Sequence, residues 1–156
     1  HPFYLFTAVL KTGFVFHVLT EFGYTIVPTM GASMLPTVEI YGDSLLVSKL
    51  YRRGRGVKVG DVVSFAGVHE PETEAVKRVL GMEGDYVLRN SPGAKHDDMI
   101  QAGRQVPQGH CWVVGDNLEY SRDSRHFGPI PLALIKGKIV AKVLPWGERK
   151  WMENNL

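Results

Sequence analysis

The stretch Ile135-Lys136-Gly137-Lys138-Ile139-Val140-Ala141-Lys142-Val143-Leu144 alternates between two kinds of residue. Small and apolar residues take one set of alternate positions: Gly137, Ile139, Ala141 and Val143. Three of the intervening positions are lysines: Lys136, Lys138 and Lys142. Successive side chains of a β-strand point to opposite faces of the sheet. The stretch therefore predicts a strand with one face in the core and the other in solvent.

Further short runs rich in branched residues lie between Thr37 and this strand, and Gly, Pro, Asn or Asp residues separate them. The runs are Ser44–Ser48, Asp61–Phe65, Glu74–Leu80, Tyr86–Leu88 and Cys111–Val114. No pattern of a long amphipathic helix follows residue 37. The sequence predicts an all-β body, built as a folded or barrel-like sheet.

The N-terminal segment is mostly apolar from Pro2 to Leu19, with Lys11 and His17 as interruptions. A membrane-spanning helix needs about 20 apolar residues, and this segment reaches that length only with Lys11 inside it. We expect residues 1–27 to form a membrane-associated apolar helix, residues 28–150 the β-rich domain and residues 151–156 a tail. A helix lying on the membrane surface is the alternative. A cleavable signal is disfavoured because no small-residue cleavage site precedes Gly31.

Composition narrows the classes of partner and cofactor. The 156 residues contain 18 Lys and Arg against 16 Asp and Glu, a balance that does not predict a nucleic-acid partner. The nearest approach to a basic run, Lys49–Arg55, is interpreted as a solvated loop, with membrane headgroups as the weaker option. Cys111 is the one cysteine, so no internal disulfide forms, and its apolar neighbours predict a buried, inert thiol. The scattered histidines predict no metal site, and nothing predicts a cofactor.

One serine lies in a turn of unusual composition, Gly31-Ala32-Ser33-Met34-Leu35-Pro36-Thr37. Small residues leave space beside the Ser33 hydroxyl, and Pro36 fixes a backbone angle just after it. Such a serine is a candidate nucleophile. An ordinary Gly/Ser/Pro turn has the same composition and remains open on these residues alone.

A serine nucleophile needs a neighbouring base, and Lys77 is the candidate. Strand alternation within Glu74–Leu80 places Lys77 on the same face as Ala75 and Val79. Burial against apolar neighbours lowers the pKa of a lysine, and a neutral amine accepts a proton. Arg78 points to the other face and stays charged. A solvated Lys77, or a Ser-His-Asp triad using His126 or His110, are the alternatives.

The loop Gly115–Pro129 holds more hydrogen-bonding side chains than a simple turn requires. Within it, Ser121 is a candidate for holding the amine of Lys77, and Asp123 with Arg125 are candidates for an ion pair that supports the loop. A solvated polar loop is the alternative interpretation.

Taken in order, these stretches resemble the type I signal peptidases, the serine–lysine membrane proteases. Gly31–Thr37 resembles their Ser-Met-x-Pro-Thr box, and Lys77–Asp85 their Lys-Arg-Val-x-Gly-x-x-Gly-Asp box. Gly115–Gly128 resembles their Gly-Asp-Asn-x-x-x-Ser-x-Asp-Ser-Arg box. The resemblance covers about residues 20 to 145. Three boxes in this order and at this spacing are a specific signal.

The resemblance assigns roles to the residues that match. Ser33 is the expected nucleophile, with its backbone N–H in the oxyanion hole, and Lys77 is the expected general base. Ser121 is expected to orient Lys77, while Asp123 and Arg125 brace the site. Met34 is a candidate for lining substrate pockets, and a core role for it is equally open. Gly31 departs from the pattern, because some bacterial members have there a hydroxyl residue that helps to hold the oxyanion.

Within that family the chain is most similar to the mitochondrial inner-membrane branch, and there to the first of two related catalytic subunits. The resemblance implies a serine endopeptidase that removes sorting sequences from precursor proteins of the intermembrane space. It implies an inner-membrane location with the catalytic domain in the intermembrane space and a homologous second subunit as partner. A bacterial or secretory-pathway signal peptidase is the alternative. A self-cleaving repressor-type domain and a non-catalytic subunit on the same scaffold are weaker ones.

Overall fold

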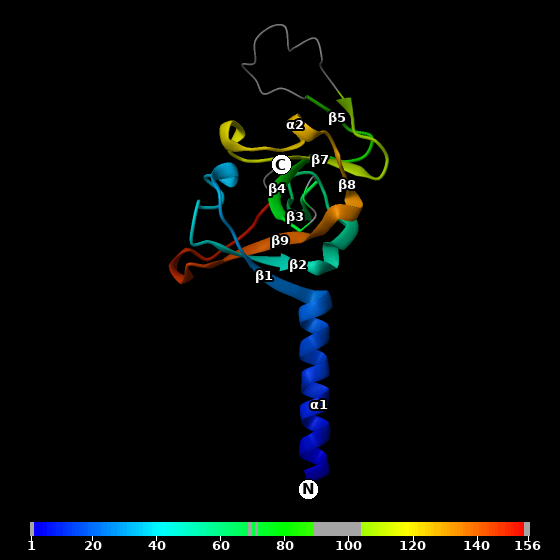
Figure 1. Ribbon diagram of the computed structural model, residues 1–156, viewed down its shortest axis with the longest axis vertical. Coiled ribbons are helices and arrows are strands. Elements are labelled where there is room, and N and C mark those ends of the chain that lie inside the picture. The colour runs from blue at the N-terminus through cyan, green and yellow to red at the C-terminus, as the bar shows by residue number, and fades with distance from the viewer. Residues whose placement is uncertain (1, 69, 71, 89–103, 155–156) are drawn as a thin grey trace.

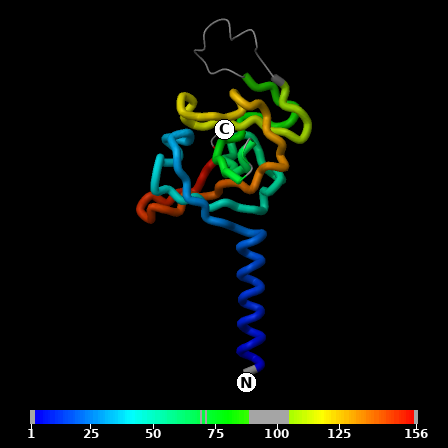
Figure 2. The backbone as a smooth tube through the Cα atoms, viewed as in Figure 1, coloured from blue at the N-terminus to red at the C-terminus, as the bar shows by residue number. Residues whose placement is uncertain are grey.

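The computed structural model describes residues 2–68, 70, 72–88 and 104–154 of the chain. An apolar helix extends away from a β-domain (Figure 1). It consists of α1 (Pro2–Val18) and a π-helical turn, η1 (Leu19–Gly23). Residues Phe3–Gly23 form a helix long and apolar enough to cross a membrane, and none of it is buried in the protein. The tube in Figure 2 shows this helix leaving the β-domain on one side. At the other end of the described chain, Asn154 Nδ2 donates to Val59 O at 2.7 Å.

The β-domain is a curled antiparallel sheet with the strand order β1-β2-β9-β3-β4-β7-β8, and β10 pairs with β9. The strands of this sheet are β1 (Tyr24–Pro28), β2 (Ser44–Ser48), β3 (Val62–Ala66), β4 (Glu74–Gly81), β7 (His110–Val114), β8 (Ile130–Pro131), β9 (Ile135–Leu144) and β10 (Lys150–Trp151). A separate ribbon joins β5 (Tyr86–Val87) to β6 (Arg104–Gln105). The all-β prediction with an N-terminal apolar helix is confirmed.

The sheet begins earlier in the chain than the sequence indicated. The sequence analysis placed the first strand after Thr37, but β1 starts at Tyr24 and pairs with β2, Ile26 lying opposite Leu46. Tyr24 and Ile26 are exposed apolar residues of this strand. Because β1 therefore lacks an alternation of apolar and polar residues, its pattern merges with that of the preceding helix.

Strand β9 lies between β2 and β3, and its buried face is the predicted one, with Ile139 and Ala141 in the core. The side chains on its other face are not all exposed to solvent. Lys142 is 4% exposed, and its Nζ lies 2.8 Å from Asp43 Oδ1 and 2.8 Å from Glu148 Oε2. The prediction of a solvated Lys142 is wrong, because two carboxylates, one on Asp43 far away in the sequence and one on nearby Glu148, compensate the charge of the buried lysine. Sequence alternation cannot anticipate such partners.

Among the described residues, the buried apolar side chains form three clusters. The first gathers around Phe65 and Val113, the second around Leu45 and Met34, and the third around Trp112 and Val106. Cys111 lies fully buried in the first cluster, and burial raises the pKa of its thiol to about 12. The prediction of a buried cysteine is confirmed, and the raised pKa leaves this thiol protonated and unreactive at neutral pH.

Candidate active site

The turn that carries Ser33 connects β1 to β2 and is held at several points. The Gly31 N–H donates to Ile40 O at 3.0 Å, and the Val38 N–H donates to Met34 O at 2.9 Å. Gly31 has φ +112°, a conformation that L side chains rarely adopt, and the short 3₁₀ helix η2 (Ala32–Met34) follows it directly. A hydroxyl side chain at position 31 would be strained. This conformation gives a physical reason for glycine there.

Strand β4 brings Lys77 to this serine. Lys77 is 6% exposed, and its Nζ lies 2.8 Å from Ser33 Oγ and donates to Val76 O at 3.0 Å. Burial lowers the pKa of Lys77, and the charges of Asp123 and Asp116 oppose that effect without cancelling it. A lysine in this state gives up its proton more readily than one in water. Ser33 and Lys77, 44 residues apart, are therefore in direct hydrogen-bond contact.

The loop that follows β7 closes over the serine turn. The Asn117 N–H donates to Ser33 O at 3.1 Å, and Asn117 Nδ2 donates to Ala32 O at 3.0 Å. Gly115 lies so close to the turn that a Cβ there would meet Ser33 O at 2.4 Å and Ser121 Oγ at 2.2 Å. Only glycine fits this approach, which explains the first residue of Gly115-Asp116-Asn117.

Asp123 organises the rest of this loop. Its side chain is 0% exposed and accepts from the Gly115 N–H at 2.9 Å, from Ser121 Oγ at 2.6 Å and from Arg125 Nε at 2.9 Å. It also caps the short helix α2 (Ser124–Phe127) by accepting from the Arg125 N–H. Burial alone raises the pKa of Asp123, but the bonds from Arg125, Ser121 and Gly115 outweigh it and hold this pKa below its ordinary value.

A second ion pair joins β4 to the loop after β7, and a hydrogen bond from Thr37 connects the serine turn to the carboxylate of that pair. Arg78 donates through Nε and Nη2 to the two oxygens of Asp116, at 2.8 and 2.7 Å, and through Nη1 to Gly60 O at 2.8 Å. The same Asp116 accepts a hydrogen bond from Thr37 Oγ1. The hydrogen bonds that Arg78 donates to Asp116 raise the pKa of this arginine, so Arg78 stays charged beside the buried lysine. Arg78 therefore supports the site from the opposite face of β4, as alternation predicts.

The family model described as "Signal peptidase, peptidase S26" matches residues 3–92 and 89–146. The chain belongs to this family. Relatives of this signal peptidase are named mitochondrial inner membrane protease subunit 1. The Schizosaccharomyces pombe protein is 37% identical over 96% of this chain and 90% of its own length. The human protein is 38% identical over 87% and 79%. A zebrafish (Danio rerio) relative named mitochondrial inner membrane protease subunit 2 is 34% identical over 78% and 63%.

A cavity of about 230 Å³ opens beside Ser33 and Lys77. Its lining comes from the end of β1 and the serine turn on one side and from residues 74–77 of β4 on the other. Strand β4 pairs with β7 only from Arg78 onward, so residues 74–77 have a strand neighbour, β3, on one side only. Among the described residues, the cavity therefore runs along a strand edge with no paired strand, as well as beside Ser33.

The other predicted site residues do not all contact Ser33 or Lys77. Ser121 is buried and bonds to Asp123, and no hydrogen bond joins it to Lys77 among the residues that the structure describes. Its orienting role stays a prediction. Met34 is 3% exposed, packs in the second apolar cluster and also lines the cavity. Met34 therefore packs in the core and also lines the cavity. Its role in binding substrate stays a prediction.

The two histidines considered as alternative bases contact residues other than Ser33. His126 Nδ1 is 4.0 Å from Asp123 Oδ1, and its side chain is 58% exposed. His110 Nδ1 bonds to Gln108 O at 2.9 Å. Within the described ranges, neither histidine bonds to Ser33, and these residues contain no group of three or more His, Cys, Asp or Glu placed to hold a metal.

Sequence reasoning missed the parts played by Thr37, Asp116 and Asn117. All three lie inside the motifs that the sequence analysis quoted, but their partners come from other segments 38 to 85 residues away. The available signal was the Gly115-Asp116-Asn117 sequence itself, because two polar residues beside a glycine often bond to neighbouring backbone. That pattern predicts a turn but does not identify the residues to which the turn bonds.

Proposed function

We propose that this signal peptidase cleaves sorting sequences from precursor proteins of the mitochondrial intermembrane space, with Ser33 as nucleophile and Lys77 as general base. The observation that carries the proposal is the 2.8 Å contact between a buried lysine and a serine at the wall of a cavity. The family match supports the peptidase activity, and the relatives named as mitochondrial inner membrane proteases support a place at that membrane.

In the proposed mechanism, neutral Lys77 takes the Ser33 proton as Oγ bonds to the peptide carbonyl carbon. The resulting ammonium gives that proton to the leaving amine as the C–N bond breaks, leaving an ester on Ser33. Water then attacks the ester, with Lys77 taking one of its protons and returning it to Ser33 Oγ as the ester C–O bond breaks. This is the serine–lysine variant of triad chemistry, in which no separate carboxylate accepts a proton.

The tetrahedral oxyanion needs donors at the serine turn. We propose the Ser33 N–H as one of them, since the reaction places the oxyanion beside the nucleophile's own backbone. Gly31 supplies no side-chain hydroxyl, and its φ of +112° disfavours any residue that would. We propose a backbone N–H or a water molecule as the second donor.

We propose that the substrate enters as an extended strand. Residues 74–77 of β4 and the end of β1 flank the cavity, and free backbone groups on a strand edge pair with an added strand. Side chains of the substrate would then point alternately into the cavity and out of it. Met34 is proposed to line the pocket nearest the nucleophile.

The apolar helix is the basis for the proposed location of the enzyme at a membrane. A 21-residue span that is exposed along its whole length fits a bilayer better than water, and we propose that Phe3–Gly23 crosses the inner membrane. The catalytic domain is proposed to face the intermembrane space. Because relatives carry the names of two protease subunits, we propose a homologous second subunit as partner.

Cleavage of a defined precursor tests the substrate class. The enzyme, solubilised together with its partner, is expected to cut an intermembrane-space precursor once, just beyond its apolar sorting segment. The product is checked by N-terminal sequencing. A matched precursor whose apolar segment carries two added arginines is expected to stay intact. Cleavage of a secretory precursor instead of the mitochondrial one would favour the bacterial or secretory alternative.

The dependence of cleavage on pH tests the base. Because Lys77 acts in its neutral form, kcat/KM is expected to rise with pH through the pKa of Lys77 and then level off. Burial lowers this pKa from 10.5, so the rise lies below that of an ordinary lysine. Asp116→Asn removes a charge that raises the pKa of Lys77, so the rise is expected to move to lower pH. A rise near pH 6.5 that Asp116→Asn does not move would instead indicate a histidine base.

A further inference from the structure

A basic segment, residues 49–55, lies against the end of the apolar helix. It comprises the 3₁₀ segment η3 (Lys49–Gly54) and Arg55. Lys49 Nζ donates to Thr20 O at 2.7 Å, and Arg52 Nη1 donates to Glu21 O at 3.4 Å. Carbonyl groups at the end of a helix lack partners within it, and cationic side chains satisfy them well. These bonds fix the basic segment to the point where the helix joins the β-domain.

The positive charge of this segment is not neutralised within the described part of the chain. The ion pairs found there use other cations, and none involves Lys49, Arg52, Arg53 or Arg55. The three arginines are exposed. The four cations outnumber the one carboxylate of the adjoining helix turn, that of Glu21. A positive patch of this kind attracts an anionic partner.

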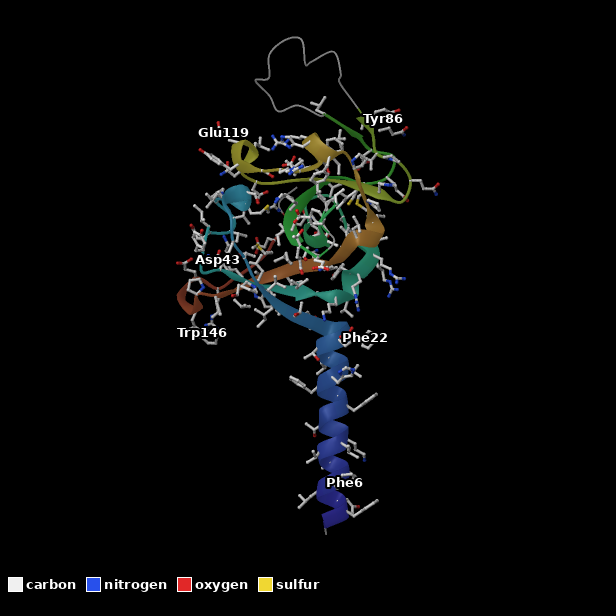
Figure 3. All side chains as sticks on the ribbon, in the orientation of Figure 1. Phe6, Phe22, Asp43, Tyr86, Glu119 and Trp146 are labelled. Atoms are coloured by element: carbon white, nitrogen blue, oxygen red, sulfur yellow. The ribbon has the colours of Figure 1, made fainter. Side chains whose placement is uncertain are left out.

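Apolar side chains surround the same junction. Leu50, in the middle of the basic segment, is 58% exposed, as is Phe22 in η1, and Leu19 is 56% exposed. Figure 3 shows Phe22 at the upper end of the helix, where the β-domain begins, with Phe6 far down the same helix. Cations and exposed apolar residues at the end of a spanning helix are typical of the headgroup layer of a bilayer.

We propose that residues 49–55 bind the phosphate groups of anionic phospholipids where the helix leaves the bilayer. The proposal rests on the membrane anchoring proposed above. The sequence alone favours a solvated loop for Lys49–Arg55 over contact with membrane headgroups. We now prefer the headgroup contact, because the bonds to Thr20 and Glu21 bring the segment to the membrane surface. With the helix as one attachment and this segment as a second, the β-domain cannot turn freely about the helix axis. The cavity beside Ser33 then keeps one orientation toward the membrane.

A fluorescent label at position 50 tests this contact on the full chain. Cys111 is fully buried, so Leu50→Cys creates a single accessible thiol for an environment-sensitive dye. The labelled protein is placed in vesicles of phosphatidylcholine alone or with 30% phosphatidylglycerol, and flotation measures anchoring separately. We expect the anionic lipid to shift the emission to shorter wavelength. The shift should weaken in 1 M salt, where charges are screened beyond about 3 Å.

Removing two of the charges gives the decisive comparison. Arg53→Asn with Arg55→Gln removes side chains that make no hydrogen bond within the described residues, and Asn suits the φ of +57° at position 53. We expect the equilibrium for contact to fall about 25-fold, so that the shift almost disappears. The matched control, Arg122→Gln with Lys150→Gln, removes two exposed charges elsewhere and is expected to keep it.

Each outcome decides one of the two proposals. Flotation in phosphatidylcholine together with a shift that the Arg53/Arg55 variant loses supports both. Flotation without any response to phosphatidylglycerol, or with equal loss in the control variant, overturns the lipid contact and leaves the anchoring intact. Flotation only with the anionic lipid overturns anchoring by the helix, while the charge-dependent shift still supports the contact.

Discussion

Replacing Ser33 by Ala is expected to lower kcat for precursor cleavage by about 10⁴- to 10⁶-fold, and Lys77→Met by a similar factor. Ser33→Ala removes the atom that forms the acyl-enzyme. Lys77→Met keeps the length of the side chain but removes the amine that lies 2.8 Å from Ser33 Oγ. Because the two groups act as one unit, the double variant is expected to be no slower than either single one. Single-turnover cleavage of the precursor measures all three rates.

The control for this comparison is Lys58→Met. Lys58 is exposed and its side chain makes no bond within the described ranges, so this variant should retain wild-type cleavage. All variants are first compared for accumulation and assembly, since an unfolded enzyme would also be inactive. Normal cleavage by Lys77→Met would place the base elsewhere, with His126 and His110 next to be tested. Cleavage by both single variants would show that Ser33 is not the nucleophile and that Lys77 is not the base.

The fold was predictable where the chain alternates and unpredictable where it does not. Strand β9 has a clear period of two, and its bounds in the structure are those expected, Ile135–Leu144. Strand β1 has apolar residues on both faces, since Tyr24 and Ile26 are exposed while Thr25 and Val27 are half-buried. A period-based interpretation therefore continues the helix through it. Patterns of burial can be read from sequence only where solvent and core select different residues.

The site shows the same division between local and non-local information. Lys77 is predictable, because three positions of one strand are enough to place it on the buried face with Val79. The bond from Ser121 to Asp123 joins near neighbours in one loop, whereas the clamp of Arg78 on Asp116 depends on residues 38 positions apart. Spacing predicts which residues share a face and cannot predict which distant side chain faces them. The hydrogen bonds of Thr37 and Asn117 could therefore be identified only in the three-dimensional structure.

Replacing Asp123 by Ala is expected to lower the free energy of unfolding by about 3 to 5 kcal/mol, the cost of breaking a buried ion pair by removing one partner. Asp123 is 0% exposed, and the variant would leave the Gly115 N–H and Ser121 Oγ without their acceptor. The loop that bonds to Ser33 O through Asn117 depends on these contacts, so activity should fall as well. Denaturant unfolding in detergent, followed by tryptophan fluorescence, measures the change.

The matched control is Glu119→Ala in the same loop, whose side chain is exposed and is labelled at the rim of the domain in Figure 3. Its effect is expected to stay within about 0.5 kcal/mol. If Glu119→Ala and Asp123→Ala destabilise equally, the loop is sensitive to any substitution and the ion pair is not the cause.

Acid pH separates the ion pair from simple loss of packing. Bonds from Arg125, Ser121 and Gly115 hold the pKa of Asp123 below its ordinary value despite burial, so the unfolded chain binds this proton first. The contribution of the carboxylate is therefore complete above the unfolded pKa of about 3.9 and is lost as pH falls through the lower folded pKa. The difference between wild type and Asp123→Ala should accordingly be constant at neutral pH and narrow below about pH 4. A difference that persists unchanged into that range would mean that the side chain acts through its packing, and the loop over Ser33 would then need another explanation for its rigidity.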